Sequence, residues 1–173
     1  MFDKFGEMES AAQINELANN LKNEGDRDSI KVLAEENGID EEVANAFIDG
    51  IIPFLCDDMS AAIGKLDVES KEVKAEELIS DWCEYIKQRC MEEEAMSKAV
   101  RAKGKTFNGC IAHILKWSFD HQRPIDKEIL KAAGVSAGKV TFGIPGMATV
   151  KKLITEYYMG GRYEKERTTK GTP

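Results

Sequence analysis

Helix start and stop signals recur at short intervals along this chain, and the apolar residues between them return every three or four positions. Ser10 and Gln13 form a capping-box pattern, and Gly25 stands where that first helix would end. Asp40 and Thr106 are further cap residues at the start of apolar runs. Signals this close together leave room only for short helices.

The pattern predicts three short helices within residues 10–52 and a fourth that begins at Asp57. Five more are predicted: over residues 74–91 and 92–103, from residue 106 to near Arg123, and over residues 125–134 and 147–158. The predicted fold is therefore mainly α, a compact multi-helix array of about eight or nine short helices. Glycine and proline allow at most a brief extended segment near residues 139–144.

Apolar faces at helical spacing predict the core. The third helix presents Val43, Phe47 and Ile51 on one face, and Trp117 falls beside the stripe of its own helix. The stripes of three further predicted helices are Leu78, Ile79, Trp82, Cys83, Ile86 and Cys90; Phe107, Cys110, Ile111, Ile114, Leu115 and Phe119; and Met147, Val150, Leu153, Ile154, Tyr157 and Tyr158.

The break at Pro53 predicts two helical parts. Residues 1–53 are expected to form a small acidic module, and residues 54–160 a larger body with a basic C-terminal half. Residues 161–173 are polar and charged and are predicted to be disordered.

Several features favour a cytoplasmic protein. The four cysteines (Cys56, Cys83, Cys90 and Cys110) show no CxxC spacing and lie in apolar or helical patterns, which predicts buried free thiols in a reducing compartment. The N-terminus has no signal-peptide pattern, and no apolar stretch is long enough to cross a bilayer. No membrane association is expected.

Charge is distributed unevenly along the chain. Residues 1–97 hold 9 basic and 25 acidic side chains, a net charge of −16, whereas residues 98–173 hold 15 basic and 6 acidic ones, a net charge of +9. Such polarity favours binding of charged partners. An alternative interpretation is that the two halves pair with each other within the fold or across a dimer.

Two sets of charged residues are candidates for partner binding. The acidic set, expected to contact a basic partner, is Glu35, Glu36, Asp40, Glu41, Glu42, Asp49, Asp57 and Asp58. The basic set, expected to contact nucleic acid or an acidic partner, is Arg101, Lys103, Lys105, Lys139, Lys151 and Lys152. A solubilising face is the alternative interpretation of the basic set.

No motif predicts catalysis, a metal or a cofactor. Residues 99–106 match a relaxed Walker A pattern, but no buried strand precedes them, which favours a helix end followed by a Thr106 cap. Residues 138–146 are glycine-rich without the Lys-Ser/Thr of a phosphate loop and are expected to form a structured turn. His113 and His121 show no zinc-ligand spacing. The chain is therefore predicted to be a non-enzymatic binding protein.

Four segments carry a resemblance to a known family: FDKFGEMESAAQINELANNL, ENGIDEEVANAFIDG, AVRAKGKTFNGCIAHILKWSF and KAAGVSAGKVTFGIPGMATVKKLITEYYMGG. They resemble anti-CRISPR proteins that inhibit the type II-A RNA-guided effector nuclease, a group similar to the PcfK-like proteins of phages and conjugative elements. The resemblance spans about residues 1–160 and implies a small protein of a mobile genetic element, in the cytoplasm of a bacterial host cell, that binds the nuclease and blocks DNA targeting or cleavage. The resemblance assigns no functional residue to any position of this sequence.

The charge pattern suggests a mechanism for such an inhibitor. The guide and target channels of these nucleases are strongly basic, and an acidic helical surface can occupy one as a mimic of nucleic acid. The alternative function is that of a DNA-binding accessory or regulatory protein of a mobile element, which acts through the basic C-terminal half.

Overall fold

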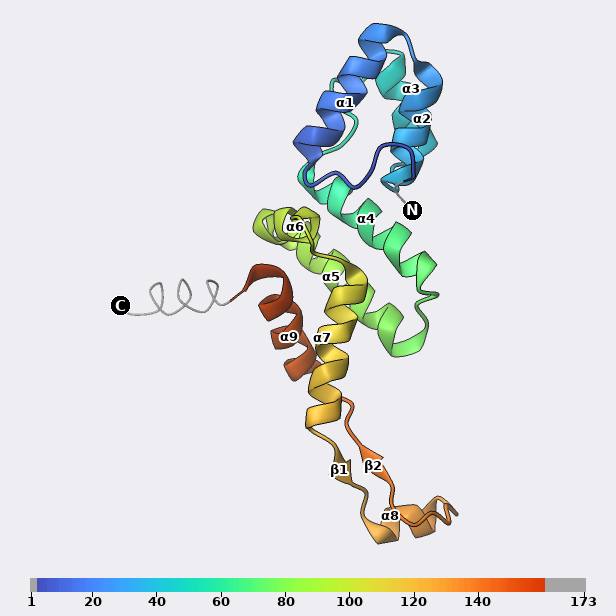
Figure 1. Ribbon diagram of the computed structural model, residues 1–173, viewed down its shortest axis with the longest axis vertical. Coiled ribbons are helices and arrows are strands. Elements are labelled where there is room, and N and C mark those ends of the chain that lie inside the picture. The colour runs from blue at the N-terminus through green and yellow to red at the C-terminus, as the bar shows by residue number, and fades with distance from the viewer. Residues whose placement is uncertain (1–2, 161–173) are drawn as a thin grey trace, which may run out of the picture. The chain divides into compact units, whose positions relative to one another are not determined.

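The computed structural model describes residues 3–160, which form nine helices and one two-stranded sheet (Figure 1). The elements are α1 (Ala11–Glu24), α2 (Arg27–Glu36), α3 (Glu41–Ile48), α4 (Asp58–Glu72), α5 (Glu77–Glu92), α6 (Glu94–Arg101), α7 (Phe107–Asp120), β1 (Arg123–Pro124), α8 (Lys127–Ala132), β2 (Thr141–Phe142) and α9 (Met147–Met159). The prediction of a mainly α fold built from short helices is confirmed. The tail predicted to be disordered, 161–173, lies outside the described residues.

The predicted cap residues form the helix ends. The Ser10 hydroxyl accepts a hydrogen bond from the Gln13 amide at 3.2 Å, and Gly25 ends α1 in the left-handed region, with φ 76°. At the start of α4 the Asp57 carboxylate accepts from the Ser60 amide at 2.7 Å, while the Ser60 hydroxyl accepts from the Asp57 amide at 3.0 Å. These bonds satisfy amides that a helix start leaves free.

The fold divides into two compact units, residues 1–109 and residues 110–173. This division differs from the predicted break at Pro53. Leu55, Cys56 and Ala61, which follow that break, belong to the same buried cluster as the side chains of the first three helices. The first 53 residues therefore share their core with the segment that follows.

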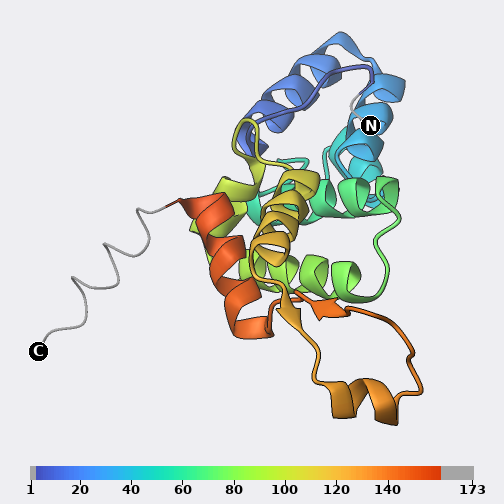
Figure 2. The same ribbon diagram turned by 60° about the horizontal axis from the view of Figure 1, so that its bottom comes forward.

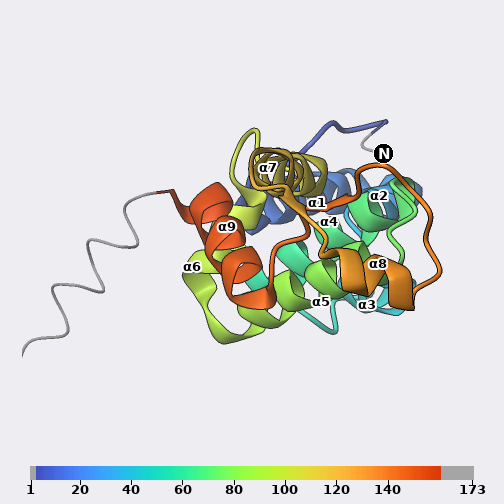
Figure 3. The same ribbon diagram turned by 90° about the horizontal axis from the view of Figure 1, so that it is seen from below.

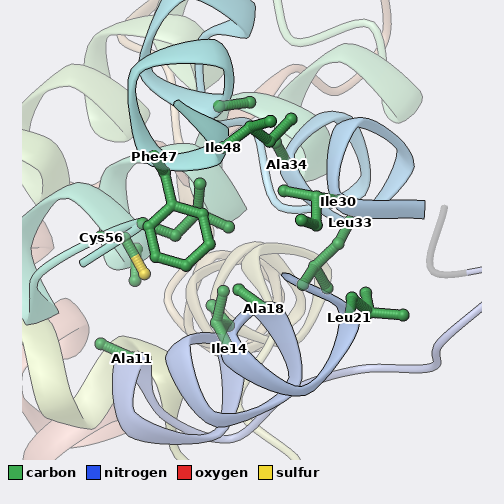
Figure 4. Close-up of a cluster of buried hydrophobic side chains, with 13 residues drawn as sticks. Ala11, Ile14, Ala18, Leu21, Ile30, Leu33, Ala34, Phe47, Ile48 and Cys56 are labelled. Carbon is green, nitrogen blue, oxygen red and sulfur yellow. The ribbon is translucent and has the colours of Figure 1, made fainter. Parts of the chain in front are cut away.

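The core of unit 1 is built around α1, α2 and α3. Figure 4 shows side chains of these helices pointing toward one another, with the ring of Phe47 between Ile14 and Cys56. Thirteen buried residues make up the cluster: Ala11, Ile14, Ala18, Leu21, Ile30, Leu33, Ala34, Ala44, Phe47, Ile48, Leu55, Cys56 and Ala61. Burial of these apolar side chains is the main favourable contribution to the folding free energy of unit 1.

Two glycines allow α4 to approach the end of α2. A Cβ placed on Gly64 would lie 2.1 Å from the carbonyl oxygen of Asn37, and one on Gly38 would lie 2.3 Å from the carbonyl oxygen of Gly64. Gly38 also has a φ of 65°, which side chains rarely adopt. The backbones of Asn37–Gly38 and α4 can meet only because both positions lack a side chain.

Unit 2 contains most of α7 together with β1, α8, β2 and α9. The Nε2 atom of His113 on α7 lies 3.8 Å from a carboxylate oxygen of Glu156 on α9, so these two helices are neighbours. Thr141 of β2 pairs with Pro124 and Phe142 pairs with Arg123, in antiparallel register. The extended segment predicted near residues 139–144 is thus present as β2, whereas its partner β1 was not predicted.

Several predicted core positions are exposed. Leu78, Leu115, Phe119 and Met147 are on the surface, as are Val43 and Ile51 of the third predicted stripe. α3 ends at Ile48, so Ile51 lies in a loop and not on the helix face. Periodicity placed these residues within the predicted buried stripes, but each helix buries a narrower face than its full apolar width.

The predictions for the cysteines and the tryptophans agree with the structure, whereas Ile79, Ile111 and Tyr157 of the predicted stripes are only half-buried. All four cysteines are buried and free, Trp82 is buried, and Trp117 is half-buried. Burial raises the pKa of Cys56 to about 12 and that of Cys90 to about 11. Within residues 3–160, no helix combines the length and apolar character needed to span a membrane.

Candidate partner-binding surface

The acidic candidates are distributed over three places in unit 1. Glu35 and Glu36 end α2, and Asp40, Glu41 and Glu42 begin α3. Asp49 follows the far end of α3, and Asp57 and Asp58 lie at the start of α4. The five carboxylates within residues 35–42 thus gather at one turn, which we call the acidic corner.

Ion pairs show how α2 and α3 are arranged. Lys31 Nζ lies 3.1 Å from a carboxylate oxygen of Glu41, and Arg27 Nη2 lies 2.7 Å from one of Asp49. Residues near the end of α2 therefore meet the start of α3, and the start of α2 meets its end. This antiparallel packing leaves Asp49 at the opposite end of the helix pair from the acidic corner.

Most of the acidic candidates already have structural roles. Glu36 accepts hydrogen bonds from the amides of Lys4 and Phe5, at 2.6 and 3.3 Å. Asp40 and Asp57 cap helices, and hydrogen bonds from Ser60 hold the pKa of Asp57 below its usual value. Asp58 lies 3.6 Å from Lys98 Nζ. These contacts orient the carboxylates but also occupy part of their hydrogen-bonding capacity.

Glu35 and Glu42 differ from the other acidic candidates. Both side chains are exposed, and neither makes a side-chain hydrogen bond or an ion pair with any residue in the part of the chain that the structure describes. Neither carboxylate is therefore part of an ion pair in that part of the chain. These two residues form the part of the acidic corner that is most available to a basic partner.

Unit 1 is more acidic at its surface than its sequence indicates. Residues 1–109 contain 13 basic and 25 acidic side chains, a net charge of −12. Two of the bases, Lys65 and Arg101, are fully buried, whereas Glu69 is the single buried acid among the described residues. Burial thus removes more positive than negative charge from the surface.

Arg101 was predicted to contact a partner, and that prediction is wrong because the side chain is buried. Its Nη2 atom donates to the carbonyl oxygen of Met8 and, at 3.0 Å, to Oδ1 of Asn37, while Nη1 donates to the carbonyl oxygen of Ala61 at 3.4 Å. Burial lowers the pKa of this guanidinium. Arg101 therefore ties the N-terminal segment, α2 and α4 together and is not available to a phosphate.

Sequence reasoning missed a second buried cation beside it. The Nζ atom of Lys65 pairs with the carboxylate of Glu7, donates to the carbonyl oxygen of Lys105 at 2.6 Å, and lies 3.8 Å from Glu69 Oε1. The other oxygen of Glu69 accepts from the Phe107 amide at 2.6 Å. The one available signal was the position of Lys65 between Ala61, Ala62 and Leu66, on the buried face of α4.

The remaining basic candidates lie in both units. Lys103 is exposed, 3.4 Å from Glu9, and Lys105 is half-buried next to Lys65. Lys139, Lys151 and Lys152 belong to unit 2 and are exposed, with Lys152 3.7 Å from Glu156. The predicted basic half after residue 97 is therefore divided, because residues 98–109 belong to the acidic unit.

The sequence segments that resemble ligand loops have structural explanations. Arg101 ends α6, Gly104 has a φ of 72°, and the Thr106 hydroxyl accepts from the Gly109 amide at 3.0 Å. This is the predicted helix end and cap, with no strand before it. In the glycine-rich segment, a Cβ on Gly143 would lie 2.3 Å from the carbonyl oxygen of Ser118, so this glycine allows β2 to approach α7.

The histidines lie on α7 and at its end. The His121 ring stacks on Trp117 at 4.0 Å, with Nδ1 2.8 Å from the Trp117 carbonyl oxygen, and His113 neighbours Tyr157 and Glu156. Within residues 3–160, no three His, Cys, Asp or Glu side chains are grouped closely enough to hold a metal ion. The geometry described for these side chains is that of packing and capping.

Comparison with known proteins identifies no relative of this chain. No protein-family model, no curated protein and no solved structure matches it.

Proposed function

We propose that this chain is a non-catalytic inhibitor of a type II CRISPR effector nuclease. In this proposal the acidic corner of unit 1 enters a basic channel of the nuclease and blocks DNA targeting or cleavage. The observation that carries it is the pair Glu35 and Glu42, two exposed carboxylates that form no ion pair and no side-chain hydrogen bond within the described residues. The sequence resemblance over about residues 1–160 supplies the identity of the partner.

Electrostatics supports this choice of partner. A unit with a net charge of −12 attracts a basic channel over long range and accelerates the encounter. Guide and target strands are bound in such nucleases through their phosphate backbones, so a surface of fixed carboxylates competes for the same cations. A rigid helical corner also loses little conformational entropy on binding.

The test is binding of the full chain to the guide-loaded nuclease, followed by a cleavage assay on a matched DNA target. We expect affinity to fall as salt rises, because the contact is mainly electrostatic. The double variant Glu35→Gln/Glu42→Gln should bind about tenfold more weakly, as expected for two rim charges worth about 0.7 kcal/mol each. Inhibition of cleavage should weaken in parallel.

Glu24, the last residue of α1, and Asp28, in the first turn of α2, are exposed acids outside the acidic corner and offer a matched control. Glu24→Gln/Asp28→Asn removes the same net charge and should leave affinity within about twofold of the original. Absence of binding by the unmodified chain would reject the proposal. Affinity that does not change with salt, or equal losses in the two double variants, would reject the acidic corner as the contact.

A second candidate function is DNA binding by a mobile-element accessory protein. It is favoured by unit 2, where residues 110–160 hold seven basic and four acidic side chains and Lys139, Lys151 and Lys152 are exposed. Fluorescence anisotropy of the full chain with duplex and single-stranded DNA tests it. Salt-dependent DNA binding that Lys139→Glu/Lys152→Glu abolishes, without any effect on the nuclease, would support this function over inhibition.

A further inference from the structure

A stack of two aromatic rings lies at the C-terminal end of α7. The ring centroids of Trp117 and His121 are 4.0 Å apart, and the angle between the ring planes is 5°. Trp117 is half-buried and His121 is exposed. Among the described residues, Trp117 is the single ring in contact with His121. The stack therefore has a covered inner ring and an exposed outer ring, which a further flat ring can join.

The two-stranded sheet adds a second exposed ring. Phe142 of β2 is 57% exposed, and it pairs directly with Arg123 of β1 in the antiparallel register. Directly opposed residues project from the same face of a sheet, with their Cβ atoms about 5 Å apart. The phenyl ring of Phe142 and the exposed side chain of Arg123 therefore lie side by side on this sheet.

The exposed rings belong to one junction of the chain. The Thr141 hydroxyl donates to Oε1 of Gln122 at 2.7 Å, and a Cβ on Gly143 would lie 2.3 Å from the Ser118 carbonyl oxygen. The residues on both sides of Phe142 thus contact the end of α7. Figures 1 and 2 show β1 leaving this end of α7 and β2 returning to it. We call four residues the aromatic junction: Trp117, His121, Arg123 and Phe142.

Cationic side chains without partners surround the aromatic junction. Residues 116–142 contain five basic and three acidic side chains, and residues 110–173 have a net charge of +5. Of the three acids, Asp126 already caps α8. Figure 3 shows α8 apart from α7 and α9, so its two lysines extend the positive charge away from the junction. All five basic residues are exposed and form no ion pair and no side-chain hydrogen bond within the described residues: Lys116, Arg123, Lys127, Lys131 and Lys139.

A single-stranded nucleic acid has the chemistry that fits this combination. Its unpaired bases offer flat faces that stack on exposed aromatic rings, and its phosphates bind cationic side chains. A duplex keeps its base faces inside the helix and offers mainly phosphates to such a surface. An acidic protein surface likewise offers negative charge without a series of flat rings. Exposed rings beside unpaired cations therefore favour a single strand over both.

We propose that the aromatic junction binds single-stranded nucleic acid, with one base stacked on His121, another on Phe142, and phosphates on Arg123 and Lys139. This inference deepens the second candidate function, because it rests on nucleic-acid binding by unit 2. It adds the form of the nucleic acid and the residues that recognise it. It does not depend on inhibition of the nuclease.

Fluorescence anisotropy of the full chain with labelled single strands, and with the duplex of the same sequence, tests the proposal. We expect the single strand to bind more tightly than the duplex, and both affinities to fall as salt rises. The ring variant His121→Ala/Phe142→Ala should bind the single strand about a hundredfold more weakly, about tenfold for each ring, with duplex affinity within about twofold of the original. The charge variant Arg123→Ala/Lys139→Ala should weaken binding of both forms.

Two further variants separate stacking from a change in the fold. Phe119 is 67% exposed and lies two positions from both Trp117 and His121, where side chains of a helix do not face each other. The matched control Phe119→Ala should therefore keep the original affinity. His121→Phe retains a ring and should bind the single strand within about twofold of the original. Unchanged circular dichroism and melting temperature confirm that the variants are folded.

The possible outcomes distinguish this proposal from the functions proposed above. Absence of single-strand binding, or equal losses in Phe119→Ala and the ring variant, overturns it. Duplex bound as tightly as the single strand, without any effect of the ring variant, also overturns it but leaves the second candidate function intact. DNA and RNA strands of the same sequence are compared, and ring-dependent binding of either one supports the proposal. No nuclease is present, so the result is independent of the inhibition assay.

Discussion

Arg101 Nη2 donates a hydrogen bond to Asn37 Oδ1 at 3.0 Å, across 64 positions of sequence, and both side chains are fully buried. The Asn37 amide nitrogen in turn donates to the Leu33 carbonyl oxygen at 2.9 Å, at the end of α2. A charged side chain of α6 is thereby tied to the helix end that approaches α4. The stability of unit 1 depends on this polar contact as well as on its apolar core.

Removing the guanidinium should be strongly destabilising. Arg101→Met keeps much of the side-chain volume but leaves buried acceptors on Met8, Ala61 and Asn37 without their donor. We expect the free energy of unfolding to fall by about 3 kcal/mol. Denaturant titration measures it, with the exposed Lys103→Met as the control, expected within about 0.5 kcal/mol of the original. Equal stability of the two variants would contradict the role of Arg101.

The buried carboxylate predicts a pH dependence. Burial raises the pKa of Glu69, so its ionised form is less favourable in the folded chain than in the unfolded one. At pH values above about 4.3, the ordinary pKa of a glutamate, the folded chain retains more protons on Glu69 than the unfolded chain does. The free energy of unfolding therefore falls as the pH rises from there through the raised pKa of Glu69.

Glu69→Gln removes this penalty and keeps an oxygen that can accept from the Phe107 amide. We expect the difference in unfolding free energy between variant and original to shift in favour of the variant as pH rises from about 4 toward neutrality. Denaturant titrations at several pH values measure that difference. A difference that stays constant, or that shifts toward the original chain, would show that ion pairing with Lys65 outweighs burial.

A methyl group at Gly64 should force the end of α2 away from α4. Alanine is favoured over glycine in a helix by about 1 kcal/mol, so a loss of stability must come from contact with the Asn37 carbonyl. We expect Gly64→Ala to lower the free energy of unfolding by about 3 kcal/mol, as in overpacked cores. Thermal unfolding measures the stability of this variant against that of the control Gly25→Ala. A Cβ at Gly25 would meet no atom within 4 Å, so the control should lose only about 1 kcal/mol, from backbone strain. A stabilised Gly64→Ala variant would argue against the close approach.

The thiols should be unreactive in the folded chain. All four cysteines are buried, and the raised pKa values of Cys56 and Cys90 leave almost no thiolate at neutral pH. Labelling with a disulfide reagent should therefore detect no fast-reacting thiol in buffer and four in denaturant. Rapid labelling of even one cysteine under native conditions would contradict the described burial.

The sequence determined where several of the helices begin. Ser10, Asp40, Asp57, Thr106 and Asp126 cap helices through hydrogen bonds to amides two or three residues away, so the whole interaction is contained in a short stretch of chain. The mainly α fold and the buried cysteines followed from the same local patterns. Of the candidate surface, the acidic character of the N-terminal unit was evident from composition alone.

Tertiary structure alone decided which charged residues are available to a partner. Arg101 and Lys103 are two positions apart and equally basic in sequence, yet one is buried among carbonyl oxygens of distant elements and the other is exposed. Likewise, Glu35 forms no ion pair and no side-chain hydrogen bond within the described residues, while its neighbour Glu36 accepts hydrogen bonds from two amides of the N-terminal segment. The physical reason is that burial and pairing depend on which elements meet in space, and those contacts join residues 31 to 93 positions apart.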